Sequence, residues 1–350
     1  MSRRTDFHAL VVQRVEPLTD DSAAITFAVP DDLAELFAFA AGQSLTIRRG
    51  DERRSYSICA PVGAAPRIGV REVAGGAVSG WLIRELKPGD TLDVQAPSGS
   101  FTPDLNDPGQ HVLIAAGSGI TPMMSIAASV LAASDASTVT LLYGNRRSDT
   151  VMFADEVADL KDAYPARMSI IHVLSREARE VDLYSGRLDR ERLAELLPVT
   201  VDVASVAHWW LCGPLGMVTD AMDMLAGLGV EPGRVHRELF WVGDDPPAMA
   251  THEEPPAGEG ASLTVILDGR STTLTLPAGT PVLDGAQKVR PDLPFACKGG
   301  VCGTCRAKLT SGKATMRRNY ALEPAELDAG YVLTCQTLPL SEEITVDYDA

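Results

Sequence analysis

The first hundred residues alternate between apolar and polar side chains in short segments. Clear examples are "ITFAVP" at 25–30, "QSLTIRRG" at 43–50, "RIGVREV" at 67–73 and "TLDVQAP" at 91–97. Each is followed within a few residues by Pro or Gly, which end strands and open turns. Alternation of this kind, rich in β-branched residues, is typical of half-buried strands. We therefore predict an antiparallel β-barrel over residues 1–106.

Residues 107–241 show a second pattern, in which continuous apolar runs are separated by stretches of helical periodicity. The runs are "HVLIAAG" at 111–117, "TVTLLYG" at 138–144, "MSIIHVL" at 168–174 and "HWWLCG" at 208–213. Apolar runs without alternation indicate strands that are buried on both faces, and the intervening helices supply the cover. The pattern predicts a parallel, doubly wound sheet.

A proline-rich acidic segment follows at 242–261. It contains four prolines, three glycines and five acidic residues, with no Lys or Arg. Because it has no apolar period that could bury a face, we predict a flexible tether. Residues 262–350 then begin with the pattern of a hairpin followed by a short helix. The predicted fold class is therefore a multidomain α/β plus all-β chain.

Composition and charge narrow the classes of function. The chain has 350 residues, 45% of them hydrophobic, and a formal net charge of −16. This acidic balance argues against nonspecific nucleic-acid binding, which needs a basic surface. The apolar stretch 111–134 is a poor membrane span because Gly117, Gly119 and Pro122 interrupt it. We expect a cytoplasmic protein with neither nucleic acid nor membrane as a partner, and with its six cysteines mostly reduced or metal-bound.

The turn "GSGITP" at 117–122 lies between an apolar run and a helical pattern. Gly117 and Gly119 let backbone N–H groups approach a pyrophosphate at a helix N-terminus, where Pro122 suits the first turn. The run at 208–213 ends in "CGP", 212–214, and strand ends of this kind line the ligand crevice of a doubly wound sheet. Taken alone, the turn is equally compatible with a strand–helix turn without a ligand, and Cys212 with a packed core thiol.

Arginines follow two further apolar runs, in "NRR" at 145–147 and "SREARE" at 175–180. They are Arg146, Arg147, Arg176 and Arg179. Cations at these strand ends suit the 2′-phosphate of NADPH, whereas the free hydroxyl of NADH usually meets an acid. A solvated arginine pair is the alternative.

In the predicted barrel, "RRSYSI" at 53–58 places Arg54 and Tyr56 on one strand face and Ser57 opposite. Arg can hold a phosphate, Tyr can stack on a flat ring, and Ser can hydrogen-bond a ring nitrogen. The glycine-rich turn "GGAVSGWL" at 75–82 is a second possible phosphate site. Each signal is weak alone, because Arg and Tyr on a strand commonly form a solvated face.

Four cysteines carry the strongest signal, in the pattern C-x4-C-x2-C-x29-C. They are Cys297, Cys302, Cys305 and Cys335. Zinc ribbons use two C-x2-C knuckles, and disulfides are unlikely in a cytoplasmic chain, so the spacing favours a plant-type [2Fe–2S] site over zinc. Cys59 and Cys212 lie outside this pattern, and we expect Cys59 to be a core thiol. The six histidines are scattered without metal spacing.

The order of these motifs, R-x-Y-S, G-x-x-S, G-x-G-x-x-P and C-G-P, resembles the ferredoxin–NADP reductase superfamily over residues 8–241. The resemblance implies a flavin-binding barrel, an NAD(P)-binding domain and, with the cysteine pattern, a C-terminal β-grasp ferredoxin domain. It implies FAD contacts from Arg54, Tyr56, Ser57, Val70, Gly76, Val78 and Ser79. It implies dinucleotide contacts from Gly117, Gly119, Thr121, Pro122, Arg146, Ser175, Arg176, Cys212, Gly213 and Pro214. Ser57, Cys212, Glu238 and Phe240 would lie beside the reacting rings.

Flavin, dinucleotide and ferredoxin modules in this order are similar to the reductase components of multicomponent oxygenases. "LYGNRR", "HWWLCGPLGMV", "HRELF" and "ACKGGVCGTC" resemble most the reductase subunits of phenylacetyl-CoA 1,2-epoxidases. The resemblance implies electron flow from NADPH through FAD and the cluster to a diiron oxygenase complex. The alternatives are a reductase for another diiron or ring-hydroxylating oxygenase, and a zinc-bound redox-sensing protein. Arg317 and Arg318 form a basic turn that we expect to dock an acidic partner.

Overall fold

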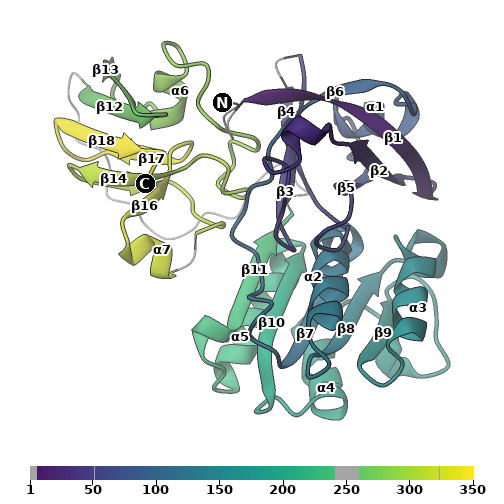
Figure 1. The fold of residues 1–350 in the computed structure, drawn as a ribbon. Helices are drawn as coiled ribbons and strands as arrows, with labels where there is room; N and C mark the ends of the chain where they lie inside the picture. Colours follow the sequence, from purple (N-terminus) through teal and green to yellow (C-terminus); the bar gives the residue numbers. More distant parts are fainter. Residues whose placement is uncertain (1–5, 51, 241–259, 323) are drawn as a thin grey trace. The chain divides into compact units, whose positions relative to one another are not determined.

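The computed structural model describes residues 6–50, 52–240, 260–322 and 324–350. It divides into two compact units, residues 7–242 and residues 243–350 with 1–6, which are treated separately below (Figure 1). Of the predicted tether, 242–261, only Gly260 and Ala261 belong to the described residues, and Ala261 already opens a strand. In the described ranges, no helix is both long enough and apolar enough to span a lipid bilayer.

The first unit begins with six antiparallel strands in the order β4-β3-β6-β1-β2-β5. Their bounds are β1 Phe7–Thr19, β2 Ser22–Ala28, β3 Ser44–Arg49, β4 Glu52–Ser57, β5 Arg67–Arg71 and β6 Thr91–Gln95. A bridge between Ile58 and Ile68 joins the end of β4 to β5, so the two outer strands of the sheet meet and the barrel closes. Leu10, Phe27 and Leu45 are fully buried inside it, as the alternating pattern requires.

Two short helices complete the barrel, η1 Asp31–Leu33 and α1 Ser79–Arg84. Helix α1 covers one side of the core with Leu82, which is fully buried. The predicted antiparallel barrel is confirmed.

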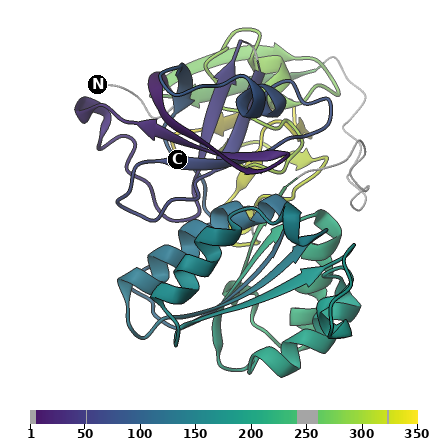
Figure 2. The ribbon, with the colours of Figure 1, turned by 90° about the vertical axis from the view of Figure 1, so that its right-hand side faces the viewer.

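The parallel sheet follows, with strands in the order β11-β10-β7-β8-β9 (Figure 1). The strands are β7 Gln110–Ala116, β8 Thr138–Asn145, β9 Met168–Leu174, β10 Val206–Gly213 and β11 Val235–Leu239. The helices are α2 Ile120–Ala133, α3 Ala154–Ala163, α4 Arg190–Thr200 and α5 Leu215–Gly227, with short η turns at Gly117–Gly119, Ser148–Thr150, Asp182–Tyr184 and Pro232–Arg234. The apolar runs of β7, β8 and β10 are largely buried on both faces because the helices cover the sheet from both sides (Figure 2). Strand β9 lies at the edge of the sheet, and its Ile170 and Ile171 are only partly buried.

Strand order explains how the helices divide between the faces. The chain moves outward from β7 to β8 and β9, then returns to β10 and β11 on the other side of β7. Right-handed crossovers therefore place α2 and α3 on one face, and α4 and α5 on the other. The carboxyl ends of the strands point toward the barrel, so this edge of the sheet is where a site can form (Figure 1). The predicted doubly wound sheet is confirmed.

The second unit is a mixed sheet in the order β13-β12-β18-β14-β16, beside a two-stranded sheet of β15 and β17. Its strands are β12 Ala261–Leu267, β13 Arg270–Leu276, β14 Arg306–Ser311, β15 Ala314–Met316, β16 Tyr331–Leu333, β17 Thr337–Pro339 and β18 Glu343–Asp347. Its helices are α6 Val282–Ala286 and α7 Pro324–Asp328. Strand β18 pairs parallel with β12, and the other pairs are antiparallel. The hairpin followed by α6 confirms the predicted β-grasp arrangement.

Local chemistry explains the first hairpin of this unit. Asp268 and Gly269 connect β12 to β13 with φ angles of 56° and 68°. An Asp-Gly pair with both φ angles positive matches the twist of antiparallel strands and fixes their register. Beneath the sheet, Leu263, Val265 and Leu283 are fully buried in a core that also contains Cys305 and Cys335.

Candidate functional site

Strand β4 carries the segment that the sequence assigned to a flavin. Arg54 is exposed and its guanidinium lies 2.7 Å from a Glu52 oxygen, whereas Tyr56 on the same face is half-buried. Burial raises the pKa of the Tyr56 hydroxyl, so the phenol stays neutral. Ser57 is buried and points the other way, where its hydroxyl donates a hydrogen bond of 3.0 Å to Glu238. One face of β4 thus presents a cation and an aromatic ring, and the end of β4 meets the parallel sheet.

Glu238 comes from β11, 181 positions further along the chain than Ser57. Burial raises the pKa of its carboxyl to about 7, and the Ser57 hydroxyl opposes part of that rise. Its neighbour in register on β10 is Cys212. Ser57, Cys212 and Glu238 therefore meet where the barrel faces the carboxyl edge of the parallel sheet. Phe240 is partly buried beside them, and its N–H approaches the carbonyl of Gly213 at 3.4 Å.

The second glycine-rich turn of the barrel is held by its own side chains. The Ser79 hydroxyl accepts a hydrogen bond of 3.0 Å from the Val73 N–H, and a Cβ at Gly76 would lie 2.9 Å from that hydroxyl oxygen. Val70 and Val78 point into the barrel core, where they are 0% and 1% exposed. A ligand could therefore meet these two residues only through their backbone. The contact that Ser79 makes in this structure shapes the turn itself.

Arg49 is a residue of this region that the sequence reasoning missed. Its guanidinium donates to the Ala77 carbonyl at 2.8 Å and lies 4.4 Å from the centre of the Trp81 ring. It joins β3 to the turn ahead of α1. The signal in the sequence was "RRG" at the end of a strand, which is common on solvated surfaces and so carries little information.

The "GSGITP" loop forms the start of α2 and packs against the end of β10. A Cβ at Gly119 would lie 2.1 Å from the Cys212 carbonyl oxygen, so only glycine allows this approach. Gly117 has φ +55°, which glycine adopts without strain. The Tyr143 hydroxyl donates to the Gly117 carbonyl at 3.0 Å and fixes the loop from below. The close approach leaves the loop backbone beside the 212–214 segment, as a pyrophosphate site requires.

Four predicted residues of this region shape the backbone or the packing. Thr121 is 1% exposed, and its hydroxyl donates to the Ser118 carbonyl at 3.0 Å, so it shapes the loop. Pro122 is buried in the first turn of α2, and Pro214 precedes the first residue of α5. Burial, followed by the charge of Glu238, raises the pKa of the Cys212 thiol well above its usual value. Cys212 is therefore a neutral thiol that shapes the crevice.

Arg71 of β5 was also missed by the sequence reasoning. A Cβ at Gly117 would lie 3.3 Å from its guanidinium, and its Nη2 lies 3.0 Å from an Asp21 oxygen. The side chain is only 19% exposed, which places a cation of the barrel against the dinucleotide loop. An arginine that ends an alternating strand gives no local sign of such a contact.

The arginines predicted to bind a 2′-phosphate lie after β8 and β9, and backbone bonds join the two segments. The Arg176 N–H donates to the Arg146 carbonyl at 2.8 Å, and the Ser175 N–H to the Asn145 carbonyl at 2.9 Å. Arg147 instead pairs with Asp149 at 2.9 Å. Behind them the side-chain N and O of Asn145 and the Nδ1 of His172 are buried without a hydrogen-bond partner among the described residues.

One acid lies among these arginines. The Glu177 carboxylate accepts hydrogen bonds from the Ser148 N–H at 2.8 Å and from the Ser148 hydroxyl at 2.9 Å. These bonds lower the pKa of Glu177, so it is ionised at neutral pH. The ends of β8 and β9 therefore combine cations with one fixed negative charge.

The four cysteines of the second unit form two pairs. Cys297 hydrogen-bonds with Cys302, and Cys305 with Cys335. Hydrogen bonding from the Cys302 thiol, followed by backbone N–H groups, lowers the pKa of Cys297 to about 5. The backbone N–H groups of Gly299 and Cys302 lie 3.3 and 3.4 Å from the Cys297 sulfur. Such donors favour thiolates, the form that ligates iron.

We call the loop at 297–305 together with Cys335 the cysteine cradle. Its glycines allow backbone conformations that other residues rarely adopt. Gly300 and Gly303 have φ +79° and +67°, and a Cβ at Gly300 would lie 3.1 Å from the Arg318 carbonyl oxygen. Lys298 adopts φ +52° despite its side chain. In the described residues, no three His, Cys, Asp or Glu side chains are placed to hold a single metal ion. Two cysteine pairs surrounded by N–H donors fit a two-iron cluster, in which each iron takes two thiolates.

Three histidines that looked scattered in the sequence come together at the amino end of the parallel sheet. The rings of His111 and His208 stack at 4.7 Å, and His236 stacks on Trp210 at 4.2 Å. Burial, more than the neighbouring rings, lowers the pKa of His111 and His236 to about 4. His111 and His236 are therefore neutral packing residues, and the three rings lie away from the edge that carries the site.

Three family models match consecutive parts of the chain. They are the oxidoreductase FAD-binding domain at 9–102, the oxidoreductase NAD-binding domain at 113–223 and the 2Fe-2S iron-sulfur cluster binding domain at 265–340. Ser57 thus lies in the matched FAD-binding segment and Cys212 in the matched NAD-binding segment, and Glu238 follows the latter. The chain is an NAD(P)H-dependent flavin and iron–sulfur oxidoreductase.

Curated relatives match the whole chain. One of the subunits of 1,2-phenylacetyl-CoA epoxidase from Escherichia coli (strain K12) is 41% identical, with 99% of both chains covered. The ferredoxin reductase component of 3-ketosteroid-9-alpha-monooxygenase from Mycobacterium tuberculosis (strain CDC 1551 / Oshkosh) is 36% identical, covering 98% of this chain and 96% of that one. The solved structure of phthalate dioxygenase reductase superposes with a TM-score of 0.59 at 26% identity, covering 97% and 98%. The chain therefore belongs to the family of oxygenase reductase components that join FAD-binding, NAD-binding and [2Fe–2S] domains in one polypeptide.

Proposed function

We propose that this chain carries electrons from NADPH through FAD and a [2Fe–2S] cluster to the diiron oxygenase that epoxidises phenylacetyl-CoA. The observation that carries the proposal is the hydrogen bond of 3.0 Å between Ser57 and Glu238, beside Cys212 and Gly119. It joins β4 of the barrel to β11 of the parallel sheet, whose register neighbour Cys212 packs against Gly119. When bound, FAD exchanges a hydride with the nicotinamide and single electrons with the cluster.

On the flavin side, Arg54 would hold the phosphate, Tyr56 would stack on the ring, and the Ser57 hydroxyl would face the reacting edge. The backbone of Val70, Val78 and the turn at 76–79 would complete the site. The exposed Arg54 and the neutral, half-buried Tyr56 support these roles. Glu238 and Phe240 would border the ring from the parallel sheet.

On the nicotinamide side, the backbone of 117–122 would bind the pyrophosphate, and 212–214 would place the nicotinamide. Arg146, Ser175 and Arg176 would take the 2′-phosphate of NADPH. Their position after β8 and β9 supports this assignment, as do the buried polar atoms of Asn145, which suit a polar ligand nearby. The Glu177 carboxylate would repel a 2′-phosphate, so the preference between NADPH and NADH must be measured.

In the second unit, Cys297 and Cys302 would hold one iron, and Cys305 and Cys335 the other. Cys297 is exposed, whereas Cys305 and Cys335 are 2% and 4% exposed. The electron would leave on the exposed side, because tunnelling partners must approach closely. A zinc-bound redox sensor is the alternative, and visible absorbance separates the two, since zinc sites are colourless.

We also propose boundaries of 1–106 for the FAD-binding barrel, 107–241 for the NAD(P)-binding domain, 242–261 for the tether and 262–350 for the ferredoxin domain. The matched family segments lie inside the three domains. We place the protein in the cytoplasm, where its exposed Cys297 thiol would stay reduced.

The oxygenase is proposed from the relative whose name contains phenylacetyl-CoA epoxidase. A reductase for another diiron or ring-hydroxylating oxygenase is the second candidate, because the ferredoxin reductase component of 3-ketosteroid-9-alpha-monooxygenase and phthalate dioxygenase reductase also match nearly the full chain. Activity with each purified oxygenase decides between them.

The test is anaerobic reduction of the FAD- and iron-loaded full chain by NADPH, followed by turnover with a purified phenylacetyl-CoA oxygenase. We expect bleaching of the flavin, the electron paramagnetic resonance (EPR) signal of a reduced [2Fe–2S] cluster, and epoxide formation. Cys305→Ala should keep NADPH-dependent flavin reduction and lose transfer to the oxygenase. Cys59→Ala, a buried thiol outside the cradle, is the matched control and should keep both.

Coenzyme choice is measured in the same preparation as kcat/KM for NADPH and NADH. We expect wild type to prefer NADPH, and Arg176→Ala to reduce that preference about tenfold, the usual effect of losing one charge-assisted hydrogen bond. A wild type that prefers NADH contradicts the assignment of the arginines. A colourless, iron-free protein from its native source contradicts the proposed function itself.

A further inference from the structure

The two buried cysteines of the cradle, Cys305 and Cys335, are held by hydrogen bonds from residues outside the four-cysteine motif. Cys305 and Cys335 are buried, and Thr334 between them is fully buried as well. The Thr334 N–H and hydroxyl both donate to the Cys305 carbonyl, at 3.2 and 2.9 Å. The Cys335 N–H, next along the chain, lies close enough to the Cys305 sulfur to favour its thiolate. Thr334 therefore fixes the peptide group between Thr334 and Cys335, whose N–H faces the Cys305 sulfur.

Tyr348 lies behind Thr334. Its hydroxyl oxygen is 2.7 Å from the Thr334 hydroxyl oxygen. A threonine hydroxyl has one hydrogen, and here it is directed to the Cys305 carbonyl, so Tyr348 must be the donor. The result is a chain of two hydrogen bonds, from Tyr348 to Thr334 to the Cys305 carbonyl, in which each bond polarises the next.

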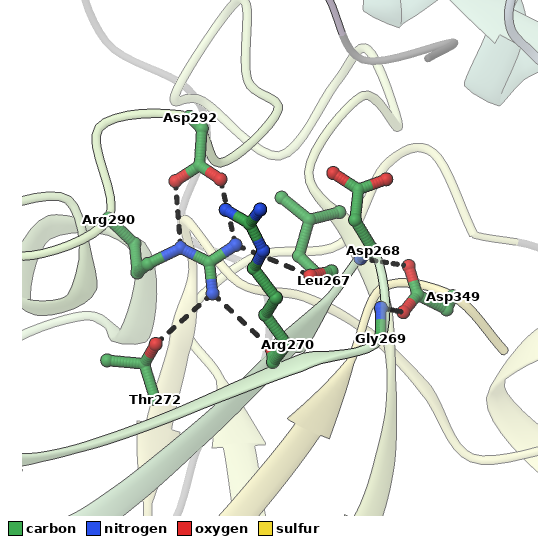
Figure 3. A network of polar contacts seen from close by, with 8 residues as sticks. All are labelled: Leu267, Asp268, Gly269, Arg270, Thr272, Arg290, Asp292 and Asp349. Atoms are coloured by element: carbon green, nitrogen blue, oxygen red, sulfur yellow. Dashed lines mark hydrogen bonds and ion pairs between the residues drawn. The ribbon is translucent and has the colours of Figure 1, made fainter. Parts of the chain in front are cut away.

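The carboxyl-terminal residues hold Tyr348 in place. Its N–H donates to the Ile266 carbonyl at 2.9 Å, which continues the pairing of β18 with β12. The next residue, Asp349, accepts hydrogen bonds of 2.8 Å from the N–H groups of both Asp268 and Gly269 (Figure 3). Two flanking anchors thus restrict the movement of the Tyr348 ring.

Arg290 fastens the same hairpin to the segment that leads into Cys297. The residue is 9% exposed, and its guanidinium donates to both Asp292 oxygens, at 2.9 and 2.8 Å. It also reaches the Thr272 hydroxyl at 3.2 Å and the carbonyls of Leu267 and Arg270 at 3.4 Å (Figure 3). The β12–β13 hairpin therefore holds both the carboxyl-terminal residues 348–349 and the segment that leads into Cys297.

We propose that Tyr348 is a positioning residue for the iron–sulfur site, which acts through Thr334 to keep the Cys335 N–H directed at the Cys305 sulfur. The inference rests on the proposed function, because it concerns the cluster that the four cysteines would hold. Hydrogen bonds to cluster sulfurs stabilise the reduced, more negative state and raise the reduction potential. Without the Tyr348 hydroxyl, this N–H is held less firmly and the potential falls.

The test is the midpoint potential of the cluster in the FAD- and iron-loaded full chain, with the flavin potential as an internal control. We expect Tyr348→Phe to lower the equilibrium constant for cluster reduction about fivefold, the usual effect of one hydrogen bond, which equals about 40 mV for a one-electron couple. Thr334→Val should do the same, and the double variant should shift no further, because the two hydroxyls act in series. Thr334→Ser, which keeps the hydroxyl, should stay at the wild-type potential.

Tyr331→Phe is the matched control for loss of a tyrosine hydroxyl in the same unit. The Tyr331 ring packs 4.6 Å from the Arg306 guanidinium, and this variant should leave the cluster potential unchanged. A wild-type cluster potential and EPR spectrum in Tyr348→Phe, with only a lower melting temperature, overturns the inference. Absence of any cluster signal in reconstituted wild type overturns the proposed function instead, so the two failures are distinguishable.

Discussion

At the scale of single residues, Glu238 is a buried carboxyl whose charge changes near neutral pH. Its pKa is raised to about 7 by burial, while the Ser57 hydroxyl favours the ionised form. The carboxyl is therefore neutral below pH 7 and negative above it. In the proposed site Glu238 would border the flavin, where a negative charge opposes the arrival of a hydride, which is itself negative.

We predict that the rate of hydride transfer from NADPH decreases several-fold as pH rises through about 7. Glu238→Gln should remove this step and keep the faster rate at high pH. Ser57→Ala should move the step to higher pH, because the carboxylate loses a donor. Stopped-flow reduction of the flavin between pH 5.5 and 8.5 measures the pH profiles of wild type, Glu238→Gln and Ser57→Ala. An unchanged step in Glu238→Gln contradicts the role of the Glu238 charge.

Among the structural elements, β5 and α3 are joined by an ion pair that fixes the barrel against the parallel sheet. Arg67 donates to both oxygens of Glu156, at 2.7 and 2.9 Å, and lies 3.3 Å from Glu16. Its side chain is 15% exposed and its guanidinium lies 5.4 Å from the Phe153 ring centre. Hydride transfer needs flavin and nicotinamide in contact, so the relative position of these elements affects the rate.

We predict that Glu156→Ala lowers the free energy of unfolding by about 1–3 kcal/mol, below the value for a fully buried pair because Glu156 is partly exposed. It should also slow hydride transfer, while Arg67→Met/Glu156→Leu recovers part of the stability. Asp149→Asn, which breaks the exposed pair with Arg147, is the control and should change stability by less than about 0.5 kcal/mol. Denaturant unfolding and stopped-flow reduction give both readouts. A rate equal to wild type in Glu156→Ala rules out the positioning role.

For the whole molecule, charge is distributed unevenly between the parts of the chain. The total is −16, whereas residues 262–350 contain nine Lys and Arg against ten Asp and Glu, a net of −1. Arg317 and Arg318 lie directly on the cradle, since the Arg317 N–H donates to the Gln336 carbonyl at 2.8 Å and the Arg318 carbonyl contacts Gly300. Two arginines near the exposed Cys297 suit an acidic electron acceptor.

We predict that Arg317→Glu/Arg318→Glu weakens coupling to the oxygenase at least tenfold at low salt and leaves NADPH-dependent flavin reduction unchanged. Arg270→Glu/Lys288→Glu makes the same change in charge at exposed positions of this unit and should have little effect. Oxygenase turnover as a function of reductase concentration, at two ionic strengths, measures the coupling. If the cluster is reduced more slowly by the flavin in the first variant, the basic turn serves transfer within the chain and the docking role is wrong.

Much of the fold was predictable because its signals are local. Alternation over residues 25–97 indicated the barrel, and continuous apolar runs indicated the parallel sheet, since each pattern reflects which strand faces are buried. The cysteine spacing indicated a two-iron site, because the ligands of a compact cluster lie close together in sequence. The Asp-Gly turn of the β12–β13 hairpin is equally local.

The sequence by itself thus determined the elements, their order and the chemistry available in each loop. Tertiary structure alone decided which side chains meet: Ser57 with Glu238, Arg67 with Glu156, and Tyr348 with Thr334. It also showed that Val70 and Val78 point into the core, and that three scattered histidines stack together. The physical reason is that periodicity records burial along one element, whereas contacts between elements depend on barrel closure, strand order and packing across long sequence separations.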